Sequence, residues 1–339
     1  MPSNPQILLD NRPTVEAILS NFKLVTSDTP ALQDGEVLVQ HHYLSLDPYM
    51  RGRMNDTKSY TAPQPLGEVM GGGTVGEVLE SRSTLFTPGD MVVGMGGWQA
   101  YSVVNPTTAP GALRKVDSTH VPLSFYLGAV GMPGVTAWYG LTNIIQGQPG
   151  QTLVVSAATG AVGSAFAALA KARGCHVVGI AGGPAKCQYA TTELGFDACI
   201  DYKQHTDAVS LSRALKLVSP GGVDGYFENV GGLALDAVML CMNDFGRIAL
   251  CGMIAGYDGN PLPMNYPALI LRSRLMIQGF IVSEHMAVWP KALKELSELV
   301  ATGKLRPRES VAQGLSAAPE AFLGLLKGKN FGKQIVKLI

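Results

Sequence analysis

The chain has 339 residues, of which 46% are hydrophobic and 15% are charged, so it is long enough for two domains with substantial cores. Lysine plus arginine and aspartate plus glutamate each number 26, which gives a formal net charge of zero. This balance excludes the basic surface that is typical of proteins binding nucleic acid or anionic membranes, and it favours a small-molecule ligand.

The first third of the chain predicts β structure. Apolar and polar residues alternate over residues 35–43, as in a half-buried antiparallel strand. Similar short runs follow at residues 73–79, 91–93 and 100–104, separated by turn-rich segments. Near residues 122–139 the pattern changes to an alternation of strands and helices, which indicates a domain boundary.

Residues 118–170 contain no Asp, Glu, Lys or Arg. Prolines and glycines interrupt this stretch, so we predict a buried sheet there rather than a membrane span. The five cysteines lie between residues 175 and 251 and form no C-x-x-C pair, which favours reduced thiols. The chain also opens without the charged start and apolar core of a signal peptide, so we expect a cytoplasmic protein.

A turn of small residues at 157–163 organises the second part of the chain. An apolar run precedes it and a helix-favouring segment follows it, which predicts strand, tight turn and helix. Gly160 and Gly163 let a ligand approach the backbone, and the helix N-terminus favours a pyrophosphate. Ala157 replaces the first glycine of the usual G-x-G-x-x-G fingerprint, so the motif alone is weak.

Strand-like and helix-like segments continue to alternate after this turn. The strand-like runs are residues 175–181, 198–202, 225–229, 247–252 and 276–282. The alternation predicts an α/β fold with a doubly wound parallel sheet and a nucleotide at the carboxyl ends of its strands. Helices are expected at 289–300 and 318–327. A last strand at 334–338 belongs either to this sheet or to the β-rich domain, and periodicity alone does not decide between them.

The segment after the second strand of this fold bears on the cofactor. An acidic residue about 20 positions after the glycines would bind the ribose hydroxyls of NAD. Residues 180–186 contain no acid and end in Lys186, a cation suited to the 2′-phosphate of NADPH. A lysine near a helix start is often only a solvated residue, so Lys186 alone is weak evidence for NADPH.

Five motifs are spread over the whole chain. They are Leu46-Asp47-Pro48-Tyr49-Met50-Arg51, Gly131-Met132-Pro133-Gly134-Val135-Thr136-Ala137, residues 157–163, Glu228-Asn229-Val230-Gly231-Gly232 and Asn330-Phe331-Gly332-Lys333. Together they resemble the medium-chain dehydrogenase/reductase superfamily, and within it the branch of leukotriene B4 dehydrogenases, prostaglandin reductases, plant alkenal double-bond reductases and bacterial curcumin reductases. Residues 45–54 and 66–78 are most similar to the curcumin-reductase group.

This resemblance implies two domains. A GroES-like, β-rich catalytic domain would be built from residues 1–125 and 305–339, so that the last strand returns to it. A Rossmann domain that binds NADPH would comprise residues 126–304. Relatives are commonly homodimers, and we expect the same here.

The resemblance also implies the cofactor contacts. Lys186 and Tyr202 match the family's phosphate-binding lysine and tyrosine, and we therefore predict NADPH. The remaining implied contacts are Met132, Thr136, Gly160, Ala161, Val162, Gly163, Asn229, Cys251, Gly252, Met253, Ile254, Tyr257, Phe280, Ile281, Val282 and Asn330.

Zinc enzymes of this superfamily carry an early cysteine, a Gly-His-Glu segment and a lobe of closely spaced cysteines. Here no cysteine precedes Cys175, and Leu66-Gly67-Glu68 lacks the histidine. We therefore expect no metal.

The family reaction is NADPH-dependent reduction of the carbon–carbon double bond of α,β-unsaturated ketones and aldehydes. Hydride reaches the β-carbon, and a hydrogen-bond donor stabilises the enolate that develops. Tyrosine suits this role, because its ordinary pKa of about 10 keeps it protonated at neutral pH. Tyr257 matches the tyrosine assigned to this role in the family, and Tyr49 is the alternative. Two other functions stay open, an NADPH quinone oxidoreductase and a non-catalytic NADPH-binding redox sensor.

Overall fold

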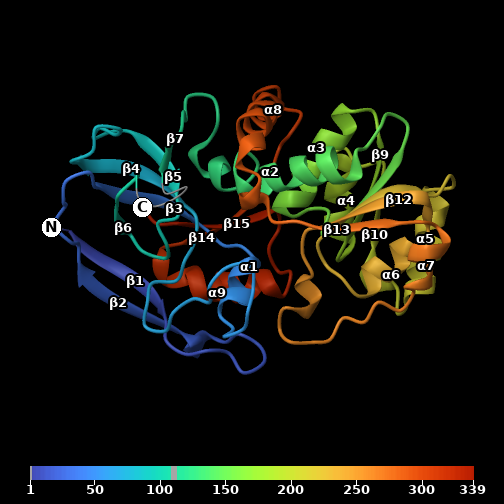
Figure 1. Ribbon diagram of the computed structural model, residues 1–339, viewed down its shortest axis with the longest axis horizontal. Coiled ribbons are helices and arrows are strands. Elements are labelled where there is room, and N and C mark those ends of the chain that lie inside the picture. Colours follow the sequence, from blue (N-terminus) through green and yellow to red (C-terminus); the bar gives the residue numbers. More distant parts are fainter. Residues whose placement is uncertain (1, 108–112) are drawn as a thin grey trace. The chain divides into compact units, whose positions relative to one another are not determined.

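The computed structural model describes residues 2–107 and 113–339. The chain divides into two compact units, one formed by the residues up to 128 together with 309–339, and the other by residues 129–308. Figure 1 shows the elements of both units. None of the described helices is long and apolar enough to cross a membrane.

Residues 129–308, all of them described, contain a parallel sheet of six strands in the order β10-β9-β8-β11-β12-β13. This is the strand order of a doubly wound, dinucleotide-binding fold, so the predicted fold class is confirmed. The strands are β8 (Thr152–Ser156), β9 (His176–Ala181), β10 (Ala198–Asp201), β11 (Val223–Glu228), β12 (Met242–Leu250) and β13 (Met276–Gly279).

Helices cover both faces of this sheet (Figure 1). On one face, α5, α6 and α7 bury Leu211, Leu235 and Leu269 in the core. On the other face, the ring of Phe166 in α3 lies 5.1 Å from that of Phe227 in β11. The helices of this unit are α2 (Met132–Tyr139), α3 (Ala161–Ala172), α4 (Pro184–Thr192), α5 (Ala208–Val218), α6 (Leu233–Met239), α7 (Ala268–Arg272) and α8 (Trp289–Ala301).

The prediction of a buried sheet for residues 118–170 is correct only for β8 and wrong for the rest of the stretch. This stretch holds α2, a π-helical segment (Gly140–Ile145), β8 and most of α3. Every residue of α2 after Met132 is buried, so this helix needs no charged face, and its uniform apolarity hides the helical period. Periodicity cannot distinguish a helix buried on all sides from a buried strand.

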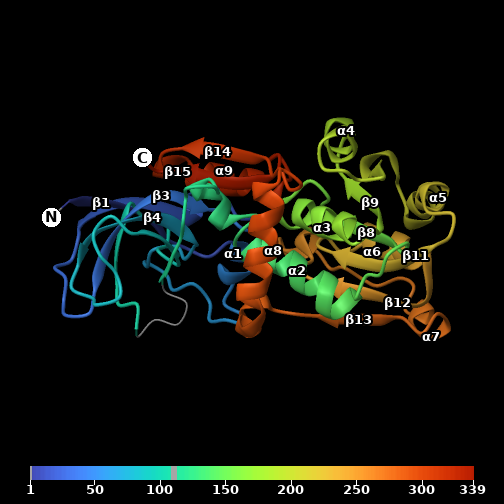
Figure 2. The same cartoon turned by 90° about the horizontal axis from the view of Figure 1, so that it is seen from above.

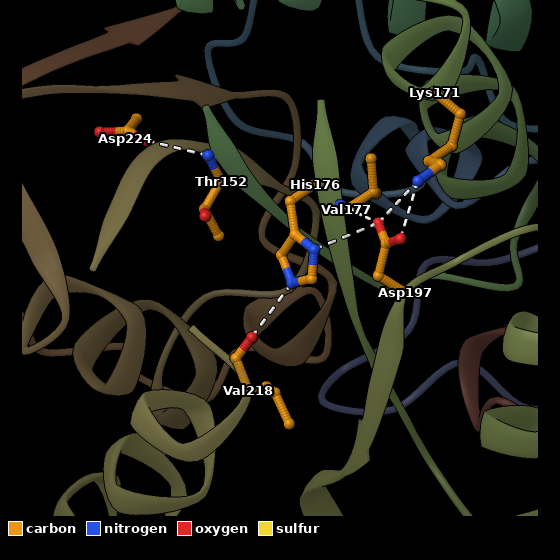
Figure 3. A network of polar contacts seen from close by, with 7 residues as sticks. All are labelled: Thr152, Lys171, His176, Val177, Asp197, Val218 and Asp224. Carbon is orange, nitrogen blue, oxygen red and sulfur yellow. Dashed lines mark hydrogen bonds and ion pairs between the residues drawn. The ribbon is translucent and has the colours of Figure 1, made fainter. Parts of the chain in front are cut away.

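A polar network closes the amino-terminal edge of the parallel sheet (Figure 3). Asp197, which precedes β10, accepts hydrogen bonds from Lys171 Nζ at 2.8 and 2.9 Å and from the amide of Val177 at 2.7 Å. His176 Nδ1 lies 3.5 Å from the same carboxylate. This network fixes β9 and β10 against α3 at the edge opposite the predicted cofactor.

The other unit is built on a sheet of the order β14-β15-β3-β4-β5-β7, with β6 also paired to β3, among the described residues. A separate antiparallel pair, β1 and β2, was not predicted. The helices and strands of this β-rich unit are β1 (Ser3–Leu9), β2 (Phe22–Asp28), β3 (Val37–Ser45), α1 (Tyr49–Arg53), β4 (Thr74–Ser81), β5 (Met91–Gly94), β6 (Tyr101–Val104), β7 (Leu113–Lys115), β14 (Glu309–Gln313), α9 (Ala318–Leu326) and β15 (Lys333–Lys337).

The last strand belongs to this β-rich unit. β15 pairs antiparallel with β3 and parallel with β14, and Figure 2 shows the three strands side by side. At its start, Lys333 Nζ donates to Asp47 Oδ1 at 2.6 Å and to the carbonyl of Leu46 at 2.8 Å, and both charged side chains are buried. Two of the sequence motifs, 286 residues apart, therefore meet in one ion pair.

His41 in β3 predicts an acid sensitivity. Its ring is buried, its Nε2 lies 2.9 Å from Ser102 Oγ, and its Nδ1 has no hydrogen-bond partner among the described residues. Burial, with a smaller effect of His42, lowers the pKa of His41 from 6.5 to about 3. Between pH 6.5 and about 3, His41 binds a proton in the unfolded chain but not in the folded protein. The contribution of neutral His41 to stability is therefore fully present above pH 6.5 and decreases as the pH falls.

We expect His41 to lower the free energy of unfolding by about 2 kcal/mol at pH 5.0 relative to pH 7.5. Urea unfolding of the wild type and His41→Gln at both pH values measures this effect, because the variant should lose that part of the pH dependence. His120→Gln, at an exposed position, serves as the control. An unchanged pH dependence in His41→Gln would contradict the prediction.

Candidate functional site

The turn between β8 and α3 has the shape that a dinucleotide site requires. Ala157 adopts a left-handed backbone conformation with φ of 50°, which favours glycine, at the position where the fingerprint usually has glycine. A Cβ at Gly163 would lie 2.6 Å from the carbonyl oxygens of both Ala157 and Ala158, so no side chain fits there. Gly160 directly precedes α3, which leaves the amide groups of the first helical turn for an anion.

Tyr202 and Lys203 lie beside Gly182, and Lys186 lies near Lys203, in the segments after the ends of β9 and β10. A Cβ at Gly182 would lie 3.0 Å from Tyr202 Cε1 and 3.1 Å from Lys203 Cε. Burial lowers the pKa of Lys186, and the nearby ammonium group of Lys203 lowers it further. Two cations and a phenol thus gather beside a glycine, which is the chemistry that a phosphate monoester requires.

Lys203 was missed by the sequence analysis. Lys203 directly follows Tyr202, a predicted phosphate contact, and this position was the signal in the sequence that could have identified it. Asp201, at the end of β10, accepts hydrogen bonds from the amides of Gly183 at 2.7 Å and of Lys203 at 3.1 Å. Asp201 therefore fixes the loop after β9, which leads to Lys186, against the loop after β10, which carries Lys203.

Glu228, at the carboxyl end of β11, was quoted in a motif but was given no role. It is fully buried and accepts hydrogen bonds from Ser156 Oγ at 2.7 Å, from Tyr226 Oη at 2.8 Å and from the amide of Val230. Burial raises the pKa of Glu228, although these hydrogen bonds oppose the shift. An acidic residue at the end of an apolar strand was the sequence signal.

Glu228 and Ser156 fix the residues around Asn229. The amide of Asn229 donates to Ser156 Oγ at 2.8 Å, and its side chain donates to the carbonyl of Ser156 at 2.8 Å. The amides of Cys251 and Gly252 both donate to the carbonyl of Glu228, at 2.9 and 3.2 Å. The ends of β8, β11 and β12 are thereby joined where the fold places a nucleotide.

The loop after β12 folds back toward this junction. It contains a short helical turn, Ile254–Gly256, and then Tyr257. A Cβ at Gly252 would lie 3.2 Å from the Tyr257 hydroxyl oxygen and 3.4 Å from the carbonyl oxygen of Asn229. Tyr257, Gly252 and Asn229, all predicted site residues, are therefore close together in the structure.

Phe280 lies in an aromatic cluster that involves α2. Its ring centre is 5.4 Å from that of Tyr139 and 6.2 Å from that of Phe227. Val282 is buried, and its carbonyl accepts a hydrogen bond from Trp289 Nε1 at 3.3 Å. In α2 itself, Thr136 Oγ1 donates to the carbonyl of Met132 at 2.7 Å, so this hydroxyl serves the helix.

Tyr49 and Asn330 belong to the β-rich unit. Tyr49 begins α1, where burial and the Asp47 carboxylate raise the pKa of its phenol, so that it stays protonated at neutral pH. The guanidinium carbon of Arg53 lies 5.8 Å from its ring centre. Asn330 Nδ2 donates to the carbonyl of Gly332 at 2.7 Å, and the residue lines an open hollow of ≈ 300 Å³ with Ser310 and Lys329.

Across residues 2–107 and 113–339, no group of three or more His, Cys, Asp or Glu side chains is arranged to hold a metal ion. All five cysteines are free thiols.

Two family models match the chain, "N-terminal domain of oxidoreductase" at residues 5–110 and "Zinc-binding dehydrogenase" at residues 161–298. NADPH-dependent curcumin reductase of Escherichia coli is 41% identical over 99% of this chain and 97% of its own length. The NADP(+)-dependent 2-alkenal reductase of Nicotiana tabacum is 40% identical over 98% and 97%.

The crystal structure of CurA from Vibrio vulnificus in complex with NADPH matches with a TM-score of 0.91 and 44% identity, over 99% of both chains. The chain is a medium-chain dehydrogenase/reductase. Within this superfamily it belongs to the branch of curcumin, alkenal and prostaglandin reductases, as its motifs indicate.

Proposed function

We propose that this protein uses NADPH to reduce the carbon–carbon double bond of α,β-unsaturated ketones and aldehydes. The observation that carries the proposal is the junction of Tyr257, Gly252 and Asn229 at the carboxyl ends of the parallel strands. This junction supports the proposal, because a nucleotide bound at the carboxyl ends of the strands would lie near the phenol of Tyr257. The relatives named for curcumin, alkenal and prostaglandin reduction support the substrate class.

The residues present fit NADPH. The glycine turn before α3 suits the pyrophosphate, and Lys186, Tyr202 and Lys203 around Gly182 suit the 2′-phosphate. Bound NADPH supplies the hydride. Asn229 and residues 251–254 would hold its nicotinamide end. Met132, Thr136, residues 280–282 and Asn330 stay predictions as cofactor contacts.

The role of the protein in the reaction is electrostatic. As hydride reaches the β-carbon of the enone, negative charge develops on the carbonyl oxygen of the substrate. The Tyr257 hydroxyl donates a hydrogen bond to this oxygen and stabilises the enolate before the α-carbon is protonated. Tyr49, also a protonated phenol, is the alternative donor.

The test is oxidation of NADPH with a panel of a curcuminoid, a long 2-alkenal and a simple quinone, with the products identified by mass. Saturated carbonyl products support the proposal. Turnover of the quinone alone would instead favour the quinone oxidoreductase. NADPH binding without any turnover would favour the redox sensor.

Lys186→Ala should raise the KM for NADPH roughly 10–100-fold, because a charge-assisted hydrogen bond to the 2′-phosphate is lost. The KM for NADH should change by less than about twofold, since NADH has no such phosphate. Lys203→Ala should act in the same direction. Lys216→Ala, at an exposed position of α5, is the matched control. Equal effects on both cofactors would reject the assignment of Lys186.

We also propose that the protein acts in the cytoplasm as a homodimer. Its free thiols support a reducing compartment, and family relationship supports the dimer. Cell fractionation and light scattering of the purified protein test the two statements, and a monomer in light scattering would reject the dimer.

A further inference from the structure

Cys187 and Cys199 are neighbouring thiols whose side chains interact. Cys187 lies near the start of α4, and Cys199 lies in β10, the strand that follows this helix. Both residues are half-buried, whereas Cys175 and Cys241 are buried. The pair therefore combines proximity with access from solvent.

The fold explains why the two sulfur atoms meet. Ala190, one helical turn after Cys187, is fully buried, so this side of α4 faces the sheet. Cys199 is in register with Gly179 of β9, and a Cβ at Gly179 would lie 3.1 Å from Cys199 Sγ. The missing side chain at Gly179 thus leaves the room that Cys199 occupies beneath α4.

The pair connects the two segments that carry the cations around Gly182. Lys186 immediately precedes Cys187, and Tyr202 and Lys203 come three and four residues after Cys199. Between them, Asp201 is hydrogen-bonded to the amide of Gly183 at 2.7 Å. A change in the contact between α4 and β10 at the two cysteines should therefore also move Lys186, Tyr202 and Lys203.

The chemistry of the two thiols differs. The interaction between them lowers the pKa of Cys187 and raises that of Cys199. Burial instead raises the pKa of Cys175, that of Cys241 to about 11 and that of Cys251 to about 12. Since the thiolate is the reactive form, Cys187 is the nucleophile of this pair.

We propose that Cys187 and Cys199 are a reversible redox site, at which a disulfide forms and weakens the binding of NADPH. With a peroxide as oxidant, the Cys187 thiolate attacks one peroxide oxygen, breaks the O–O bond and becomes a sulfenic acid. Cys199 then attacks the Cys187 sulfur and expels hydroxide, which leaves as water with the Cys199 proton. Two thiols and one hydrogen peroxide thus give one disulfide and two waters.

The disulfide weakens NADPH binding by changing the distance between α4 and β10. Its S–S bond of about 2.05 Å brings the two sulfur atoms within bonding distance, and we expect α4 and β10 to shift toward each other as it forms. Lys186 and Tyr202 move with them, away from the arrangement around Gly182. This consequence rests on the proposed role of these residues at the 2′-phosphate, whereas formation of the disulfide does not. Because binding linkage is reciprocal, bound NADPH should also disfavour the disulfide.

The experiment treats the purified protein with hydrogen peroxide, with and without NADPH, and then blocks free thiols under denaturing conditions. Peptide mass spectrometry should find a link between Cys187 and Cys199, lost on reduction and less abundant when NADPH was present. Fluorescence titration should show that the Kd for NADPH rises at least about tenfold on oxidation, the equivalent of one charge-assisted hydrogen bond, while that for NADH changes little.

Cys187→Ser and Cys199→Ser should each abolish the link and keep NADPH affinity unchanged by peroxide, whereas Cys175→Ser should behave as wild type. Absence of the link in the wild type, or an unaltered Kd for NADPH once it has formed, overturns the proposal. An equal loss of NADH affinity overturns its placement at the 2′-phosphate. All readouts are binding or mass measurements, so a failure to reduce enones would be recognised separately.

Discussion

Tyr257→Phe is expected to lower kcat for enone reduction by about 10²–10³-fold, the loss typical for removal of one oxyanion donor. The hydroxyl oxygen lies beside Gly252 and Asn229, so its removal takes a hydrogen bond from the developing enolate and leaves the phenyl ring in place. The KM for NADPH should change by less than about threefold, because the interaction exists only in the transition state. Steady-state kinetics with a deuterated cofactor measure both quantities, and an isotope effect on kcat should emerge as hydride transfer becomes rate-limiting.

Tyr266→Phe is the matched control, since Tyr266 packs on the core beneath α7 and should keep wild-type kcat. Tyr49→Phe separates the two candidate donors. If kcat fell only in Tyr49→Phe, the donor role would pass from Tyr257 to Tyr49. A full kcat in Tyr257→Phe would show that its hydroxyl does not act on the enolate.

Glu228→Ala is expected to lower the free energy of unfolding by about 3–5 kcal/mol, a loss typical of breaking a buried hydrogen-bonded charge site. The hydroxyls of Ser156 and Tyr226 and the amide of Val230 would lose their common acceptor inside the protein. Since Ser156 also accepts two hydrogen bonds from Asn229, the affinity for NADPH should decrease in the same variant. Urea unfolding at neutral pH and NADPH titration measure the two effects.

Glu228→Gln separates charge from hydrogen bonding. Its amide oxygen still accepts from Ser156 and Val230, so most of the stability should remain. Burial raises the pKa of Glu228 in the folded protein above its ordinary 4.5. In the wild type, this carboxyl therefore contributes most to stability below pH 4.5, where it is protonated in both states. The contribution is lost as the pH rises through the folded-state pKa. Glu228→Gln should lack this decline. A Glu228→Ala protein as stable as the wild type would mean that water replaces the carboxylate without cost.

Much of the Rossmann unit could be predicted from local sequence. Each strand-like run predicted after residue 150 overlaps a strand, because buried parallel strands are short apolar segments bounded by turns. The glycine turn was also predicted, including the odd position of Ala157, which the backbone holds at φ of 50° despite its Cβ. Local rules succeed here because strand, turn and helix follow one another in the chain.

These local rules did not identify residues whose role depends on contacts with residues far away in the sequence. Lys203 becomes meaningful only once β10 lies beside β9 and brings it to Gly182. Glu228 has its donors on β8 and in the loop after β11, and no spacing in the sequence indicates that Ser156 is one of them. Helix α2 was missed for a related reason, since burial on all sides removes the polar face that marks a helix.

The ion pair between Lys333 and Asp47 has a consequence for synthesis. On the ribosome, residues 129–308 emerge as one continuous stretch and contain all strands of their sheet. β3, by contrast, must wait for β15, so the Asp47 carboxylate stays without its cation until nearly 290 further residues have been made. We expect the parallel sheet to form during translation and the β-rich unit to close last, with β3 exposed to chaperones or to aggregation in the interval.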